Sequence, residues 1–207
     1  MDQAVAAVLE DYGVRAAAEE KLMQALPPEE LARRADELLL PIGPATGSLL
    51  NLLIKQAQAR SLLEVGTSYG YSTIWLAEAA RQTGGQLVTL ELRAPKSEHA
   101  RSQLERAGLA GQVQLHVGDA LKLLDALPGP FDFVLIDLWK DLYIEVFERV
   151  YPKLAAGAIV VADNMIQPEG VRHLARAYRQ HVRAARDMTS VLLPVGSGIE
   201  VSRFQAH

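Results

Sequence analysis

From about residue 61 onward, short apolar runs alternate with longer segments in which apolar residues recur at helical spacing. Five such runs occupy residues 62–65, 86–90, 113–117, 131–136 and 158–162. Short runs separated by helix-length segments are typical of a parallel sheet whose strands are connected by helices. The pattern therefore predicts an α/β fold with a doubly wound, mostly parallel sheet.

Two more apolar runs close the chain, at residues 190–194 and 199–203, after a helical pattern at about 171–186. The connection between these two runs, Val-Gly-Ser-Gly at 195–198, is short enough for a β-hairpin. An antiparallel pair at the end of a parallel sheet is a common arrangement. The sequence thus predicts seven strands, of which the last two form a C-terminal antiparallel hairpin.

The front of the chain carries helical patterns instead of strand patterns. Apolar residues recur at helical spacing over 5–12, a second helix begins at 27–30, and a third follows Gly43. No repeat, low-complexity tract or linker divides the sequence. We expect a single domain, with residues 1–58 as extra N-terminal helices that form a cap and residues 59–207 as the core.

Composition narrows the function classes. The 207 residues carry a net charge of −4, and the basic residues are scattered, so extended nucleic-acid binding is not expected. The absence of cysteine excludes disulfides and thiolate metal sites. No apolar run approaches the ~18 residues of a membrane span, and the N-terminus lacks the pattern of a signal peptide. We therefore expect a cytoplasmic protein without membrane contact.

Oxygen-bearing side chains follow two of the predicted strands. Asp137 comes after the fourth run, and Asp163 and Asn164 come after the fifth. Two carboxylates and one amide oxygen suit a hard cation such as Mg²⁺, Mn²⁺ or Ca²⁺, which would keep open positions for a substrate with two adjacent oxygens. Lys140 stands close by, although a lysine on a loop is usually a solvated charge. Helix caps or turns are the structural alternative for these acids.

A second group of residues favours a nucleoside. Gly66 and Gly70 lie between the first strand and the next helix, where a tight turn and free amides can receive an anionic group. Glu91 ends the second strand and can accept hydrogen bonds from ribose hydroxyls. Asp119 follows the third strand and suits either an adenine amino group or a helix N-cap. The loop lacks the middle glycine of the G-x-G-x-x-G fingerprint, so a plain strand-to-helix turn is the alternative.

The motifs, taken together and in order, resemble those of S-adenosylmethionine-dependent O-methyltransferases of the catechol and caffeoyl-CoA type. The motifs that carry this resemblance are 64–66, 71–72, Glu91, 137–141 and 162–164. The likeness runs from about residue 42 to 200. It implies a Rossmann-like class I methyltransferase fold, S-adenosylmethionine as cofactor and Mg²⁺ or another hard divalent cation as metal.

The resemblance also implies roles for single residues. The implied cofactor-binding residues are Ile42, Glu64, Gly66, Tyr69, Gly70, Ser72, Glu91, Asp119, Asp137 and Trp139. The implied metal ligands are Asp137, Asp163 and Asn164, with Lys140 as catalytic base. Glu200, in Gly-Ile-Glu, corresponds to a glutamate that accepts a hydrogen bond from the hydroxyl that is not methylated. Leu138 and Ser197 depart from a histidine and an aspartate common in that family.

The sequence therefore predicts Mg²⁺-dependent methyl transfer to one hydroxyl of a catechol-like small molecule. Two alternatives remain: methylation of a hydroxyuridine in transfer RNA by the same site, and a cofactor-binding module without chemistry. An NAD-dependent dehydrogenase fits less well, because the glycine pattern differs. Related enzymes occur as monomers and as dimers, so a homodimer stays open.

Overall fold

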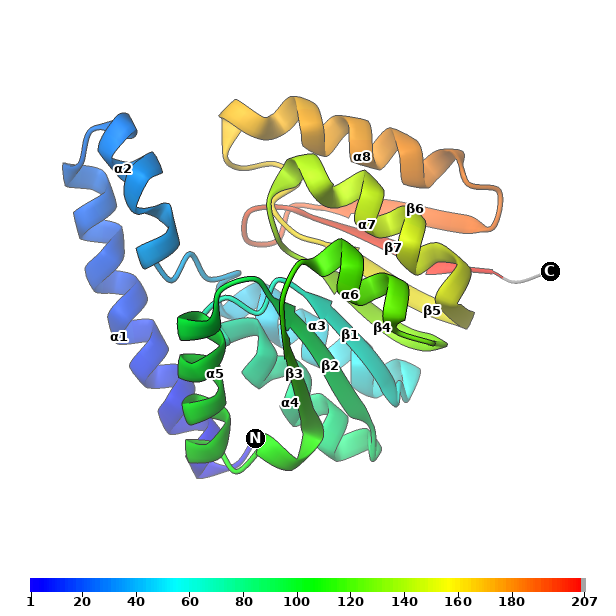
Figure 1. Ribbon diagram of the computed structural model, residues 1–207, viewed down its shortest axis with the longest axis horizontal. Coiled ribbons are helices and arrows are strands. Elements are labelled where there is room, and N and C mark those ends of the chain that lie inside the picture. The colour runs from blue at the N-terminus through cyan, green and yellow to red at the C-terminus, as the bar shows by residue number, and fades with distance from the viewer. Residues whose placement is uncertain (206–207) are drawn as a thin grey trace.

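A computed structural model describes residues 1–205 as a seven-stranded sheet flanked by helices (Figure 1). The strands are β1 (Ser61–Val65), β2 (Gln86–Glu91), β3 (Val113–Val117), β4 (Phe131–Ile136), β5 (Leu154–Ala162), β6 (Met188–Leu193) and β7 (Ile199–Phe204). Their order is β3-β2-β1-β4-β5-β7-β6. The first five strands are parallel, and β7 pairs antiparallel with both β5 and β6. This confirms the predicted mostly parallel sheet and its C-terminal hairpin.

Helices cover both faces of the sheet. They are α1 (Gln3–Ala25), α2 (Pro28–Arg34), α3 (Pro44–Ala57), α4 (Tyr71–Thr83), α5 (Ala94–Arg106), α6 (Ala120–Ala126), α7 (Tyr143–Val150) and α8 (Arg172–Ala184). Short 3₁₀ turns occupy Ala35–Glu37, Ala110–Gln112, Lys140–Leu142, Tyr151–Lys153 and Glu169–Val171.

Burial on both faces explains why the parallel strands read as continuous apolar runs. Along β4, Phe133 and Leu135 pack into the core beneath α1, α3, α4 and α5. Val134 and Ile136, which point the other way, pack into the second core with α6, α7 and α8. Successive side chains of a strand alternate between faces, so one apolar run supplies both cores.

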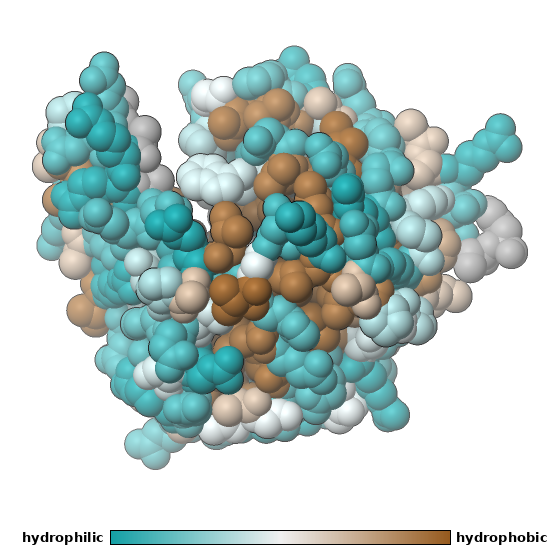
Figure 2. Space-filling model, in the orientation of Figure 1, coloured by the Kyte–Doolittle hydropathy of each residue, from teal (hydrophilic) through white to brown (hydrophobic). Residues whose placement is uncertain are grey.

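Helix α1 packs on the rest of the molecule mainly with its first half. The buried residues of α1 lie in its first half, at Val5, Val8 and Tyr12. Its second half and α2 form an arm beside the body (Figure 1), and the space-filling view is hollowed between this arm and the body (Figure 2). Residues 38–43 cross from the arm to α3. Within residues 1–205, no helix combines the length and apolar character needed to span a membrane.

Strand register places the ends of three strands side by side. Val65 of β1 pairs with Ile136 of β4, and Ile136 pairs with Ala162 of β5. The next residue of each chain segment therefore leaves the sheet at the same edge. This edge is where parallel α/β sheets bind their ligands.

Candidate active site

Asp137 and Asp163 stand next to each other at that edge. The Asp137 amide donates to the Val65 carbonyl at 2.9 Å, and the Asp163 amide donates to the Ile136 carbonyl at 3.1 Å, so both backbones continue the sheet pattern. Asp163 is only 1% exposed. Among the described residues, neither of its carboxylate oxygens accepts a hydrogen bond of ordinary geometry. The fold thus buries a carboxylate without satisfying it.

The pKa values of both acids, Asp137 and Asp163, are raised above their ordinary values. Burial raises the pKa of Asp163 to about 8, and the neighbouring Asp137 carboxylate adds to the rise, while the Asn164 amide and Lys140 lower it in part. Burial also raises the pKa of Asp137, against the lowering effect of Lys140. A divalent cation would remove the repulsion and supply the missing partners. The donor set therefore fits a hard cation, with the Asn164 amide oxygen as third ligand.

Lys140 reaches the same place from the 3₁₀ turn after β4. Its Nζ donates to the Tyr143 hydroxyl at 2.5 Å and to Oδ1 of Asn164 at 3.0 Å. Burial lowers the pKa of Lys140, while the charges of Asp137 and Asp163 raise it. A lysine held in this way is available for proton transfer beside the carboxylates.

Tyr143 is a partner that the sequence analysis did not assign to the site. It is completely buried at the start of α7, and its hydroxyl donates to the Asp163 carbonyl at 3.3 Å. The i, i+3 spacing of Lys140 and Tyr143 was the available signal. Tyr143 therefore connects the lysine to the segment that carries Asp163.

The loop after β1 approaches Asp137 through its backbone. Gly66 has φ +110°, and a Cβ built there would lie 1.8 Å from the Asp137 carbonyl oxygen. Gly70 has φ +93°, and its Cβ would lie 2.8 Å from the Ala100 Cβ. Both positions require glycine, because a side chain would collide and the backbone is left-handed. The predicted cofactor loop is thus in direct contact with a predicted metal ligand.

Acidic residues line the same edge. Glu91 accepts hydrogen bonds from the Ser68 amide at 2.7 Å and the Arg93 amide at 2.8 Å. Each of its oxygens keeps acceptor capacity for a hydroxyl group. Asp119 is exposed and caps α6 by accepting from the Lys122 amide at 3.1 Å, as the N-cap alternative predicted.

Glu64 lies beneath the glycine loop and is fully buried. Its Oε2 accepts from the hydroxyls of Thr73 and Thr89, both at 2.6 Å. Its other oxygen has no partner in the part of the chain that the structure describes. Burial raises the pKa of Glu64 to about 7, although the nearby hydroxyls of Ser72, Thr73 and Thr89 lower it.

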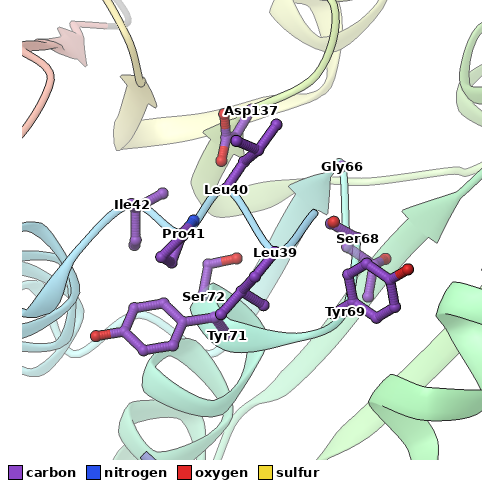
Figure 3. A pocket seen from close by; sticks show the side chains of 11 residues that line it. Leu39, Leu40, Pro41, Ile42, Gly66, Ser68, Tyr69, Tyr71, Ser72 and Asp137 are labelled. Atoms are coloured by element: carbon purple, nitrogen blue, oxygen red, sulfur yellow. The ribbon is translucent and has the colours of Figure 1, made fainter. Parts of the chain in front are cut away.

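A small pocket opens above these residues (Figure 3). Its walls come from the segment 39–42, the loop 66–72 and Asp137. The pocket brings together five of the predicted cofactor residues, Ile42, Gly66, Tyr69, Ser72 and Asp137. Trp139 lies outside the pocket lining and is 60% exposed.

The sequence analysis did not assign Leu39, Leu40 and Pro41 to this pocket, although an apolar run before Gly43 was the visible signal. In Figure 3, Leu40 points toward Asp137, and Leu39 lies between Ser72 and the Ser68–Tyr69 side. The segment that leaves the N-terminal arm therefore covers the loop after β1.

Glu200 does not join this group. Its carboxylate is fully buried and accepts from Arg183 at 2.7 and 3.1 Å and from the Ser190 hydroxyl at 2.6 Å. These partners come from α8 and β6. The carboxylate is held within the fold by these hydrogen bonds, so a substrate hydroxyl would share it with Arg183 and Ser190, and the role of Glu200 stays a prediction.

Within the part of the chain that the structure describes, no three His, Cys, Asp or Glu side chains form a group that could hold a metal ion. The candidate cation site therefore depends on the amide of Asn164 in addition to Asp137 and Asp163. Asn164 has φ +55°, a left-handed conformation that asparagine tolerates better than most residues.

Comparisons with known proteins match most of the chain. Residues 14–203 match the family model described as O-methyltransferase. The chain is 39% identical over 132 residues to a catechol O-methyltransferase from Niastella koreensis, a match that covers 62% of this chain and 59% of that protein. It is 31% identical to caffeoyl-CoA O-methyltransferase 2 from Eucalyptus globulus, covering 76% and 72% of the two chains.

A solved structure gives the same result for the fold. The crystal structure of an O-methyltransferase from Streptomyces achromogenes in complex with SAM superimposes with a TM-score of 0.78 and 30% identity. The match covers 100% of this chain and 91% of the other.

The raised pKa of Glu64 predicts a pH-dependent stability. Its pKa rises from 4.5 in the unfolded chain to about 7 in the fold, so the folded protein loses stability as the pH rises through this window. The loss attributable to Glu64 is at most about 3 kcal/mol at pH 8. We expect Glu64→Gln to remove this part of the pH dependence, measured by denaturant unfolding at pH 5, 6.5 and 8. Glu105→Gln, at an exposed position, is the control, and parallel pH curves for wild type and Glu64→Gln would contradict the prediction.

Proposed function

The chain belongs to the O-methyltransferase family, and on that premise we propose that it transfers a methyl group from S-adenosylmethionine to one hydroxyl of a catechol-like small molecule in a Mg²⁺-dependent reaction. The observation that carries this proposal is the buried carboxylate of Asp163 beside the half-buried Asp137, with Lys140 next to both. The names of the catechol and caffeoyl-CoA relatives support a phenolic acceptor.

The pocket of Figure 3 is the proposed place for S-adenosylmethionine. The glycine loop offers its backbone to the polar methionine end, and Glu91 accepts from the ribose hydroxyls with the acceptor capacity left by its two amide bonds. Leu39 to Ile42 cover the pocket and exclude water from the sulfonium. The solved relative in complex with SAM has the same fold at 30% identity, which supports this placement.

Asp137, Asp163 and Asn164 are the proposed ligands of the divalent cation. A cation held there would supply positive charge that favours ionisation of a phenol hydroxyl beside it. The fit rests on the two unsatisfied oxygens of Asp163 and on the burial and the repulsion that raise its pKa. Asn164 Oδ1, which accepts from Lys140 in this structure, would serve the cation instead.

Lys140 is the proposed general base. Its neutral amine takes the proton of the hydroxyl that will be methylated, and the resulting oxygen attacks the methyl carbon in line with sulfur. The carbon–oxygen bond forms as the carbon–sulfur bond breaks, and the sulfonium becomes the neutral thioether of S-adenosylhomocysteine. Holding oxygen, carbon and sulfur collinear supplies the rest of the catalysis. The Tyr143 hydroxyl keeps the amine in position.

The proposed metal dependence follows from the two unsatisfied carboxylate oxygens of Asp163. We expect a chelator to abolish methyl transfer and Mg²⁺ to restore it. Asp163→Asn keeps the shape of the side chain and removes its charge, so we expect Mg²⁺ activation to weaken at least about tenfold, while the metal-free protein becomes more stable at pH 8 because a buried charge is gone. Asp141→Asn, an exposed position in the 3₁₀ turn after β4, should match wild type. Equal metal activation in Asp163→Asn and wild type would refute the ligand assignment.

The role of Lys140 is tested separately. Lys140→Met keeps the length of the side chain but has no proton acceptor, so we expect kcat to fall about 100-fold or more. Binding of S-adenosylhomocysteine, measured by calorimetry, should stay unchanged. Lys122→Met on α6 is the control. A Lys140→Met variant with wild-type kcat would show that another group takes the proton.

The acceptor is tested with a panel. We expect turnover of vicinal diphenols with labelled S-adenosylmethionine and Mg²⁺ to exceed that of matched monophenols, because two adjacent oxygens can share one cation. Bulk transfer RNA is the comparison that represents the hydroxyuridine alternative. Incorporation of label into RNA above that into diphenols would assign the site to nucleic acid instead.

A further inference from the structure

The turn between β6 and β7, residues 195–198, lies between two separate parts of the proposed site. It is closed by the Gly198 amide, which donates to the Val195 carbonyl at 2.9 Å. On one side it touches the segment after Asn164, and on the other side it touches the segment that covers the cofactor pocket. None of its four residues lines that pocket.

Three backbone hydrogen bonds connect the turn to the segment after Asn164. The Ser197 carbonyl accepts from the amides of Ile166 at 2.9 Å and Gln167 at 3.0 Å. The Gly198 carbonyl accepts from the Met165 amide at 2.8 Å. The proposed ligands Asp163 and Asn164 are thus followed immediately by a segment fixed to the turn.

Side-chain packing reinforces this connection. Gly198 has φ +85°, and a Cβ built there would lie 2.4 Å from Cγ1 and 2.8 Å from Cβ of Ile166. Ile166 is held on its other side too, because its carbonyl accepts from Nε of Arg172 at 2.9 Å. Ile166 therefore cannot move away freely, and a side chain at position 198 would displace the segment after Asn164.

Gly196 faces the other way. It has φ +56°, and its Cβ would lie 2.4 Å from Oγ1 of Thr46 and 3.1 Å from the Ile42 carbonyl oxygen. Thr46 is fully buried in the first turns of α3, and Ile42 lines the cofactor pocket. A side chain at 196 would therefore push the segment that covers the pocket.

We propose that this turn is a positioning element with two separable contacts: Gly198 sets the metal-binding segment, and Gly196 sets the cofactor-covering segment. The inference rests on the proposed function. Neither glycine touches a reacting atom, and each acts through the residue it packs against. Two alanine substitutions only two residues apart should consequently damage the binding of two different ligands.

The experiment compares Gly198→Ala, Gly196→Ala and a control, Gly108→Ala. Gly108 has a similar φ of +65°, but no heavy atom of the described residues lies within 4 Å of its Cβ position. The control therefore carries the cost of a left-handed alanine without a collision. Mn²⁺ binding is measured by water-proton relaxation, and S-adenosylhomocysteine binding by calorimetry.

We expect Gly198→Ala to weaken Mn²⁺ binding about tenfold, as for other residues that support metal ligands, with S-adenosylhomocysteine affinity within about twofold of the control. Gly196→Ala should show the opposite pattern. Thr46→Ala removes the atom nearest to position 196, so adding it to Gly196→Ala should recover part of the S-adenosylhomocysteine affinity. Equal losses of both ligands in both variants, or losses no larger than in Gly108→Ala, would overturn the inference.

A second variant keeps the test decisive if Gly198→Ala does not fold. Ile166→Ala removes the side chain that rests on Gly198 and should lower Mn²⁺ affinity while S-adenosylhomocysteine affinity is retained. Unchanged Mn²⁺ affinity in Ile166→Ala would count against the positioning role. Failure of the proposed function has a different signature, because the wild-type protein itself would then bind no Mn²⁺.

Discussion

Two adjacent carboxylates at the ends of β4 and β5, the half-buried Asp137 and the buried Asp163, are the constraint on which the candidate site depends. Burying Asp163 without a hydrogen bond costs stability, and placing Asp137 next to it adds repulsion. The register of the sheet prevents them from separating, since Ile136 and Ala162 are paired neighbours. An arrangement this unfavourable supports the proposed cation, because strongly perturbed acids of this kind gather at functional sites.

The same sheet edge joins the two halves of the proposed reaction. Gly66 lets the loop after β1 lie directly against the Asp137 carbonyl, so the proposed cofactor loop and a proposed metal ligand share one backbone contact. The N-terminal helix adds a support from outside the sheet. The Tyr12 hydroxyl donates to the Tyr69 carbonyl, and Glu19 accepts from the Leu39 amide at 2.6 Å. Helix α1 thus holds both the loop after β1 and the segment 39–42, which together line the pocket.

The fold was readable from sequence because the strands buried on both faces give continuous apolar runs, as 131–136 does. The proximity of Asp137 and Asp163 followed as well, since parallel strands end at one edge. Other features depend on contacts between segments that are far apart in the sequence, which no local pattern shows. Glu200 alternates with Ile199 and Val201 along β7, so its side chain faces the opposite side of the sheet. The sequence does not show that Arg183 lies on that side and donates to the Glu200 carboxylate. Contacts between distant segments decide such cases.

The engagement of Glu200 bears on how the proposed substrate would be selected. Its carboxylate is held by Arg183 and Ser190, so the second hydroxyl of a diphenol would have to share it with these partners. A cation at the proposed ligands Asp137, Asp163 and Asn164 would favour two adjacent oxygens on one hard ion independently of Glu200. Trp139, next to the proposed site along the chain, is exposed and is not packed into a rigid wall. The proposed site would therefore distinguish diphenols from monophenols more sharply than one ring substituent from another, because the cation would select for adjacent oxygens.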